Sequence, residues 1–232
     1  MSPAGSADRS GPLRATYGAE LEQLRLQIEV MGVMVDENLE RMRRVLETGR
    51  PDLAEQALAA DDGIDAMNVS LTERCYDVLA RENPVASDLR LVVSVVRVIS
   101  ELERVGDLCL RVVKAALDHD LLVRSDRAFE ILRLMADEAV ELFRLALRAW
   151  GTADLELATR LSDGSRSIDL SYAQLVETLV ALSGPDAAAV AMRTLVAGQA
   201  LERIADHSAI LGSRLRYLIT GDPGHLAAEV RR

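Results

Sequence analysis

The chain has 232 residues, a formal net charge of −10, 49% hydrophobic residues and only 3% aromatic residues. This composition is typical of a folded protein with an aliphatic core; it favours helices over sheets and excludes a disordered chain. The acidic excess argues against a nucleic-acid partner, because binding to a phosphate backbone needs a basic surface.

The N-terminal stretch MSPAGSADRSGP lacks both helical periodicity and the apolar segment of a secretory signal, so residues 1–13 are predicted to be a disordered tail. No stretch reaches the ~18 uninterrupted apolar residues of a membrane span. Cys75 and Cys109 form no CxxC motif and lie in apolar helical patterns. These features predict a cytoplasmic protein with two buried, reduced thiols and no membrane insertion.

Six helices are predicted in chain order, because apolar residues recur with a period of 3.6 in each segment. Prolines support the boundaries: Pro51, Pro84 and Pro185 each open a segment, as proline does at a helix start. Short links between the segments predict antiparallel neighbours. The predicted helices are residues 14–48, 51–82, 84–119, 124–150, 153–183 and 186–220, followed by a C-terminal tail at 223–232.

Two sequence features occur twice. ELERVGD at 101–107 matches ALERIADH at 200–207, so that Glu202 and Asp206 follow Glu103 and Asp107 by 99 positions. DDGIDAMN at 61–68 matches SDGSRSIDLS at 162–171, aligned on Ile-Asp. A tandem duplication accounts for both matches. The predicted fold is therefore all-α, with two tandem three-helix bundles at residues 14–120 and 121–222.

The repeated acidic pairs allow two interpretations. Like charges four residues apart on a helix cost roughly 0.2–0.5 kcal/mol, and such residues can simply be solvated at the flank of a helix, near Arg104 or Arg111. Alternatively, Glu103 and Asp107 converge with Asp61 and Asp65 of the preceding helix to bind a cation, which would neutralise four carboxylates. An all-oxygen set suits Mg, Mn, Ca or Fe(III) better than structural zinc.

The second half carries a weaker version of this pattern. Asp169, Glu202 and Asp206 are present, but Ser165 stands at the position of Asp61. His207 is expected at the surface or in a capping role, and Glu101 falls in the solvent-like arc of its helix. Trp150, at a helix end, is expected to be a packing anchor. No histidine fits a Glu-x-x-His di-iron motif, and no phosphate loop or nucleophile elbow is present.

PVASDLRLVVSVVRVISELERVGDLCLRVVKAAL at 84–117 and ALERIADHSAILGSRLRYLITGD at 200–222 resemble the two signature regions of the PhoU family, and DDGIDAMN is similar to its Asp-x-x-x-Asp element. The resemblance extends from about residue 17 to 222. It implies two tandem three-helix bundles, often assembled as a homodimer, and acidic motifs that bind metal, including iron or zinc clusters in some members. Ser165 and Ala205, which replaces a usual glycine, depart from the family pattern. The implied metal ligands are Asp61, Asp65, Glu103, Asp107, Asp169, Glu202 and Asp206, with Fe, Zn, Mn and Mg left open.

The resemblance also implies a function. PhoU proteins are regulators rather than enzymes, and they are thought to couple the phosphate-specific ABC transporter to a membrane sensor histidine kinase, with negative regulation of phosphate uptake and of starvation signalling. Two alternatives stay open at this point. One is a metal-binding helical bundle with an enzymatic or storage role, and the other is a plain helical scaffold whose acidic residues are solvated.

Overall fold

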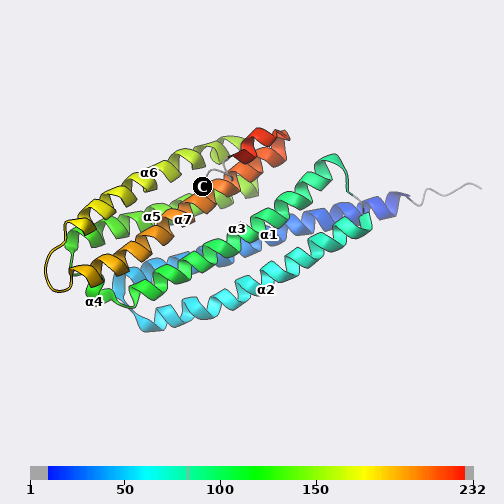
Figure 1. Cartoon of the computed structure of the whole chain (residues 1–232). Coiled ribbons are helices and arrows are strands. Elements are labelled where there is room, and N and C mark those ends of the chain that lie inside the picture. Colours follow the sequence, from blue (N-terminus) through cyan, green and yellow to red (C-terminus); the bar gives the residue numbers. More distant parts are fainter. Residues whose placement is uncertain (1–9, 83, 228–232) are drawn as a thin grey trace, which may run out of the picture.

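The structure, a computed structural model, describes residues 10–82 and 84–227, and the described part is all-α (Figure 1). All six predicted long helices are present, which confirms the predicted fold class. Two short elements were not predicted: α4 lies in the link between the third and fourth long helices, and η1 follows the last one. The elements are α1 (Ser10–Thr48), α2 (Pro51–Glu82), α3 (Ala86–Ala116), α4 (His119–Leu122), α5 (Asp126–Thr152), α6 (Leu155–Val180), α7 (Ala187–Thr220) and the 3-10 helix η1 (Pro223–Leu226).

The helix ends follow from local chemistry. Asp154 precedes α6, and its Oδ1 accepts hydrogen bonds from the backbone N–H groups of Glu156 and Leu157, which have no partner inside the helix. Gly49 and Gly221 follow α1 and α7 with φ of 65° and 72°, a left-handed conformation that glycine adopts without steric cost. Of the predicted N-terminal tail, residues 1–9 lie outside the described residues, and residues 10–13 belong to α1.

Helices α1, α2 and α3 pack against one another, and so do α5, α6 and α7. The two groups join because α3 lies along α7 and α1 contacts α5 (Figure 1). The apolar residues that recur with helical period in α3 are buried; Val98, Leu102, Val105 and Cys109 belong to a hydrophobic core that also includes residues of α5, α6 and α7. One continuous core therefore holds both repeats together, and the surfaces that carry the acidic motifs lie beside it.

Candidate metal sites and the seam between the repeats

The first acidic cluster forms where α2 packs against α3. Burial raises the pKa of Asp61 to about 6, and the nearby carboxylates of Asp65, Asp107 and Glu103 add to the shift. Burial also raises the pKa of Glu103, with Asp107 and Asp65 as the next causes. Asp61 and Glu103 thus both experience the charges of Asp65 and Asp107, so the fold brings the four predicted residues of the first half near one another.

The backbone of α3 comes close to Asp61 at Gly106. A Cβ atom at position 106 would lie 3.1 Å from Asp61 Oδ1, closer than ordinary van der Waals contact. The glycine of the Glu-Arg-Val-Gly-Asp motif therefore makes room for the carboxylate of the neighbouring helix. Since Gly106 is buried within α3, its role is this close approach and not a turn.

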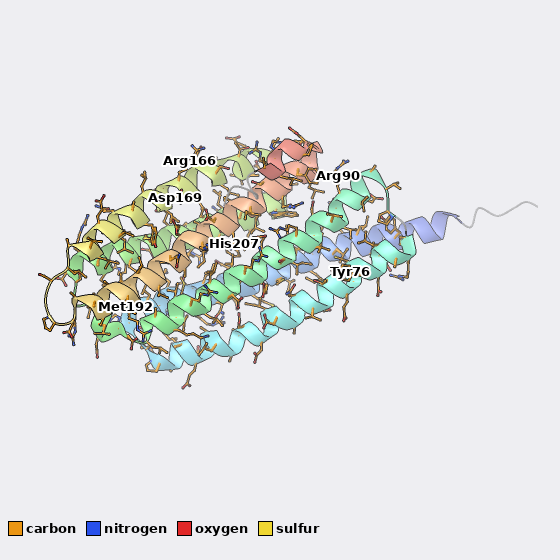
Figure 2. The ribbon with its side chains drawn as sticks, viewed as in Figure 1. Tyr76, Arg90, Arg166, Asp169, Met192 and His207 are labelled. Atoms are coloured by element: carbon orange, nitrogen blue, oxygen red, sulfur yellow. The ribbon has the colours of Figure 1, made fainter. Side chains whose placement is uncertain are left out.

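The second cluster forms where α6 packs against α7. Burial raises the pKa of Glu202, and the carboxylates of Asp206 and Asp169 raise it further. The three predicted residues of the second half are therefore neighbours as well; Figure 2 labels Asp169 on α6. Ser165 is fully buried, and its hydroxyl donates a hydrogen bond of 3.2 Å to Asp206 Oδ1. A neutral donor thus occupies the place of the missing fourth acid.

Hard cations take several oxygen ligands, and carboxylates supply them in both clusters. Within residues 10–82 and 84–227, no three His, Cys, Asp or Glu side chains stand close enough together to hold an ion as they are placed. The clusters are groups of neighbouring carboxylates whose oxygens would have to close around a cation. Their mutual repulsion, visible in the raised pKa values of Asp61, Glu103 and Glu202, is what a cation would relieve.

Glu101 and His207 differ from the expectation drawn from the sequence. Glu101 has no exposed side-chain surface, and its Oε2 lies 2.5 Å from Nδ1 of His207, whose side chain is 13% exposed. Arg97 and Arg104 pair with the other carboxylate oxygen at 2.9 and 3.4 Å. The predicted solvent-like position of Glu101 and the predicted surface or capping role of His207 are therefore wrong. Both residues lie in the seam between α3 and α7, where a helical wheel of one repeat cannot show the partner helix.

A groove with a volume of about 470 Å³ opens along the same seam. Its polar lining comes from Arg104, Asp107 and Arg111 on α3 and from Gln199, Arg203 and His207 on α7. Figure 2 shows His207 where α7 passes beside α3. Sequence analysis did not identify this basic groove, although Arg104 and Arg203 occupy equivalent positions of the two repeated motifs, 99 residues apart.

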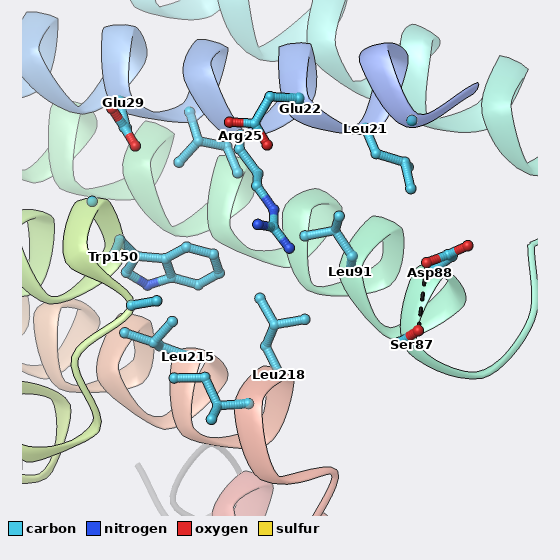
Figure 3. Close-up of a pocket in the computed structure, with 15 residues that line it drawn as sticks. Leu21, Glu22, Arg25, Glu29, Ser87, Asp88, Leu91, Trp150, Leu215 and Leu218 are labelled. Carbon is cyan, nitrogen blue, oxygen red and sulfur yellow. Dashed lines mark hydrogen bonds between the residues drawn. The ribbon is translucent and has the colours of Figure 1, made fainter. Parts of the chain in front are cut away.

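A second cavity, of about 500 Å³, lies between α1, the start of α3 and the end of α7 (Figure 3). Trp150 forms one wall, and its Nε1 donates a hydrogen bond of 2.9 Å to the backbone carbonyl of Leu211. Arg25 reaches into the cavity from α1 (Figure 3). The indole joins the end of α5 to α7 and so acts as the packing anchor that the sequence suggests.

The remaining expectations concern thiols and membranes. Cys75 and Cys109 are both buried and free, as expected. Burial raises the pKa of the Cys75 thiol to about 11 and that of Cys109 still further, so both thiols stay protonated. Among the described helices, none has the length and apolar character required to cross a bilayer.

Comparison with known proteins gives a consistent result for both halves. The family model described as the PhoU domain matches residues 28–116 and 132–215. The chain is 30% identical over 216 residues to a phosphate-specific transport system accessory protein PhoU homolog of Pseudomonas putida, which covers 92% of this chain and 84% of the relative. It is 27% identical over 212 residues to the accessory protein PhoU of Escherichia coli K12, covering 88% and 86%.

Solved structures extend the similarity to the three-dimensional fold. The crystal structure of PhoU from Pseudomonas aeruginosa superposes with a TM-score of 0.83 at 29% sequence identity, covering 89% of this chain and 100% of the other. The phosphate transport system regulatory protein PhoU from Streptococcus pneumoniae gives a TM-score of 0.79 at 26% identity, covering 89% and 98%. Both repeats therefore have counterparts in the same solved proteins.

Proposed function

This chain belongs to the PhoU family of phosphate transport accessory and regulatory proteins, which are not enzymes. From this membership we propose that it acts in the cytoplasm as an adaptor between a phosphate-specific ABC transporter and a sensor histidine kinase. In this role it restrains phosphate uptake and the starvation response when phosphate is plentiful. The observation that carries the proposal is the match to accessory proteins along both repeats and 92% of the chain.

The repeats define the units of this adaptor. We propose domain boundaries at residues 14–120 and 121–222, which enclose the two matched segments 28–116 and 132–215. We also propose a homodimer, which the family resemblance implies. Contact with the transporter and the kinase would then use the outer surface of the helices, because the inner faces of both repeats are occupied by the shared core.

We further propose that the acidic clusters are cation sites. In the first cluster the ligands would be Asp61, Asp65, Glu103 and Asp107. In the second cluster the ligands would be Asp169, Glu202 and Asp206, and the affinity for the ion would be lower. The gathered carboxylates and the raised pKa values of Asp61, Glu103 and Glu202 support this, since a bound cation removes the repulsion between neighbouring carboxylates. Oxygen-only ligands are compatible with Mg, Mn or Fe, and zinc carboxylate sites also occur.

Deletion of the gene in the native bacterium tests the regulatory role. We expect phosphate-starvation genes to be expressed at high phosphate in the deletion strain, because the restraining adaptor is missing. A plasmid copy of the full chain should restore repression, and reporter expression at high and low phosphate is the measurement. Starvation genes that stay repressed at high phosphate in the deletion strain would contradict the proposal.

Metal analysis of the purified protein tests the cation sites separately. We expect bound metal in the native chain and a loss of about half or more of it in Asp61→Asn/Glu103→Gln, because this variant removes two of four ligands from the fuller cluster. The matched control is Asp163→Asn, a 78% exposed carboxylate that pairs only with Arg166. Elemental analysis after dialysis against buffered metal gives the count per chain. Equal metal content in all three proteins would contradict the proposed cation site and would indicate that the clustered carboxylates are solvated residues at the flank of their helices.

A further inference from the structure

The groove between α3 and α7 is basic in a protein whose net charge is −10. Three arginines and one carboxylate line the groove. The carboxylate is that of Asp107, which is exposed to solvent and also belongs to the first acidic cluster. Arg104 and Arg203 are equivalent residues of the two repeats, so the groove lies where the duplicated motifs face each other. The fold thus concentrates positive charge at one place in spite of the overall acidic composition.

Two of these arginines are not held by an ion pair, although the charge of Arg203 acts on the adjacent Glu202. In the described part of the chain, neither Arg111 nor Arg203 makes a side-chain hydrogen bond or salt bridge, and both are exposed on the groove. Arg127 and Arg166, by contrast, each contact an acid on their own helix. The guanidinium groups of Arg111 and Arg203 are therefore available to an external anion.

The buried carboxylate of Glu101 contacts two side chains that line the groove. Glu101 lies between His207, at 2.5 Å, and Arg104, at 3.4 Å, and thereby orients two of the side chains that line the groove. The contact to His207 uses Nδ1, which leaves Nε2 as the ring nitrogen for a ligand. Side chains oriented in this way lose less conformational freedom when they bind, which favours a binding site over a chance patch of charge.

Arginine recognises phosphate by paired, charge-assisted hydrogen bonds from its planar guanidinium group. The volume of about 470 Å³ falls within the range of small-molecule sites and exceeds the needs of one phosphate group. We propose that the groove binds a small anion that carries at least two phosphate groups, held by Arg104, Arg111 and Arg203 with Gln199 and His207. The groove shares Asp107 with the first acidic cluster, but the proposed anion contacts are basic and neutral side chains, so anion binding does not require a bound cation.

Titration calorimetry of the full chain with sodium pyrophosphate tests the site. The protein is first treated with EDTA and the titration is run without divalent ions at constant ionic strength, so that the acidic clusters do not contribute. We expect saturable binding, weaker binding of orthophosphate, and at least a tenfold loss of pyrophosphate affinity in Arg111→Gln/Arg203→Gln. Both side chains are exposed, so circular dichroism and thermal melting should be close to those of the native protein.

The control is Arg127→Gln/Arg166→Gln, which removes the same charge from exposed positions outside the groove. It should bind pyrophosphate within about twofold of the native chain. The variant Arg111→Lys/Arg203→Lys keeps the charge but loses the paired geometry, and we expect an intermediate affinity. The proposal is overturned if the native chain does not bind pyrophosphate, if both arginine-to-glutamine variants lose affinity equally, or if sulfate binds as tightly.

Discussion

The two acidic clusters differ by two residues at equivalent positions of the repeats. The first repeat has Asp61 beside Gly106, where a Cβ atom would lie 3.1 Å from the carboxylate. At the equivalent positions the second repeat has Ser165 and Ala205, both buried. Ala205 carries the methyl group that Gly106 lacks, and Ser165 has a shorter side chain than Asp61. The two departures from the family pattern therefore compensate each other sterically, and the hydroxyl of Ser165 keeps a polar contact by donating to Asp206.

The raised pKa of Asp61 predicts a pH dependence of stability in the metal-free protein. Its folded pKa of about 6 lies above the ordinary aspartate value, so the folded state binds the proton more tightly than the unfolded state. The resulting contribution to stability is complete below about pH 4 and is lost as the pH rises through about 6. We expect it to be on the order of 1 kcal/mol after allowance for solvent screening.

Asp61→Asn should remove the decrease in stability that accompanies the rise in pH. In EDTA, we expect the variant to melt at a higher temperature than the native chain at pH 7.5 and at a similar temperature at pH 4, as measured by differential scanning fluorimetry. Asp163→Asn, a change at an exposed and ion-paired acid, should leave the pH profile unaltered. An Asp61→Asn profile parallel to that of the native protein would show that the carboxylates do not repel one another as the structure indicates.

The antiparallel packing of α3 and α7 brings equivalent helices of the two repeats into contact. The 99-residue offset makes Glu101 equivalent to Ala200 and His207 equivalent to Leu108, and all four are buried or nearly so in the seam. One half of the seam thus contains a hydrogen-bonded polar pair where the other half contains two apolar residues. The repeated helices use different chemistry at equivalent positions, which fixes how the two repeats face each other.

This equivalence predicts the outcome of a double-mutant cycle. Glu101→Ala should destabilise the fold by about 3 kcal/mol, because it leaves the largely buried imidazole of His207 without the carboxylate that it contacts. Glu101→Ala/His207→Leu reproduces the Ala200 and Leu108 combination and should recover about 1 kcal/mol or more of that loss. Urea unfolding followed by circular dichroism gives the free energies. A double variant that is less stable than the sum of the single losses would contradict this account.

The shared hydrophobic core determines the properties of the whole molecule. Core residues of α1, α2 and α3 belong to one cluster with those of α5, α6 and α7, so the repeats are not independent domains joined by a linker. The acidic clusters lie on the α2–α3 and α6–α7 pairs, and the basic groove lies between α3 and α7. The molecule therefore presents two acidic regions related by the duplication, with a basic seam between the repeats.

Much of the fold was predictable because helical periodicity and proline positions are local signals. The α2 bounds agree with the prediction at both ends, and the apolar stripe of α3 is buried as expected. The elements α4 and η1 were not predicted, since each has four residues and is too short for a periodic pattern. The convergence of Asp61, Asp65, Glu103 and Asp107 was predictable from the repeated spacing on neighbouring helices, and the raised pKa values of Asp61 and Glu103 agree with it.

Periodicity and repeated spacing along the chain predict the helical fold, the duplication and the acidic residues of each repeat, because these depend on spacing within one or two helices. The contacts where the repeats meet depend instead on how the helices pack in three dimensions. A helical wheel assigns Glu101 to solvent, but the packing of α7 on α3 buries it against His207 and gathers Arg104, Arg111 and Arg203 around one groove. Residues about 100 positions apart become neighbours there, and a pattern confined to one helix carries no information about the helix that covers it.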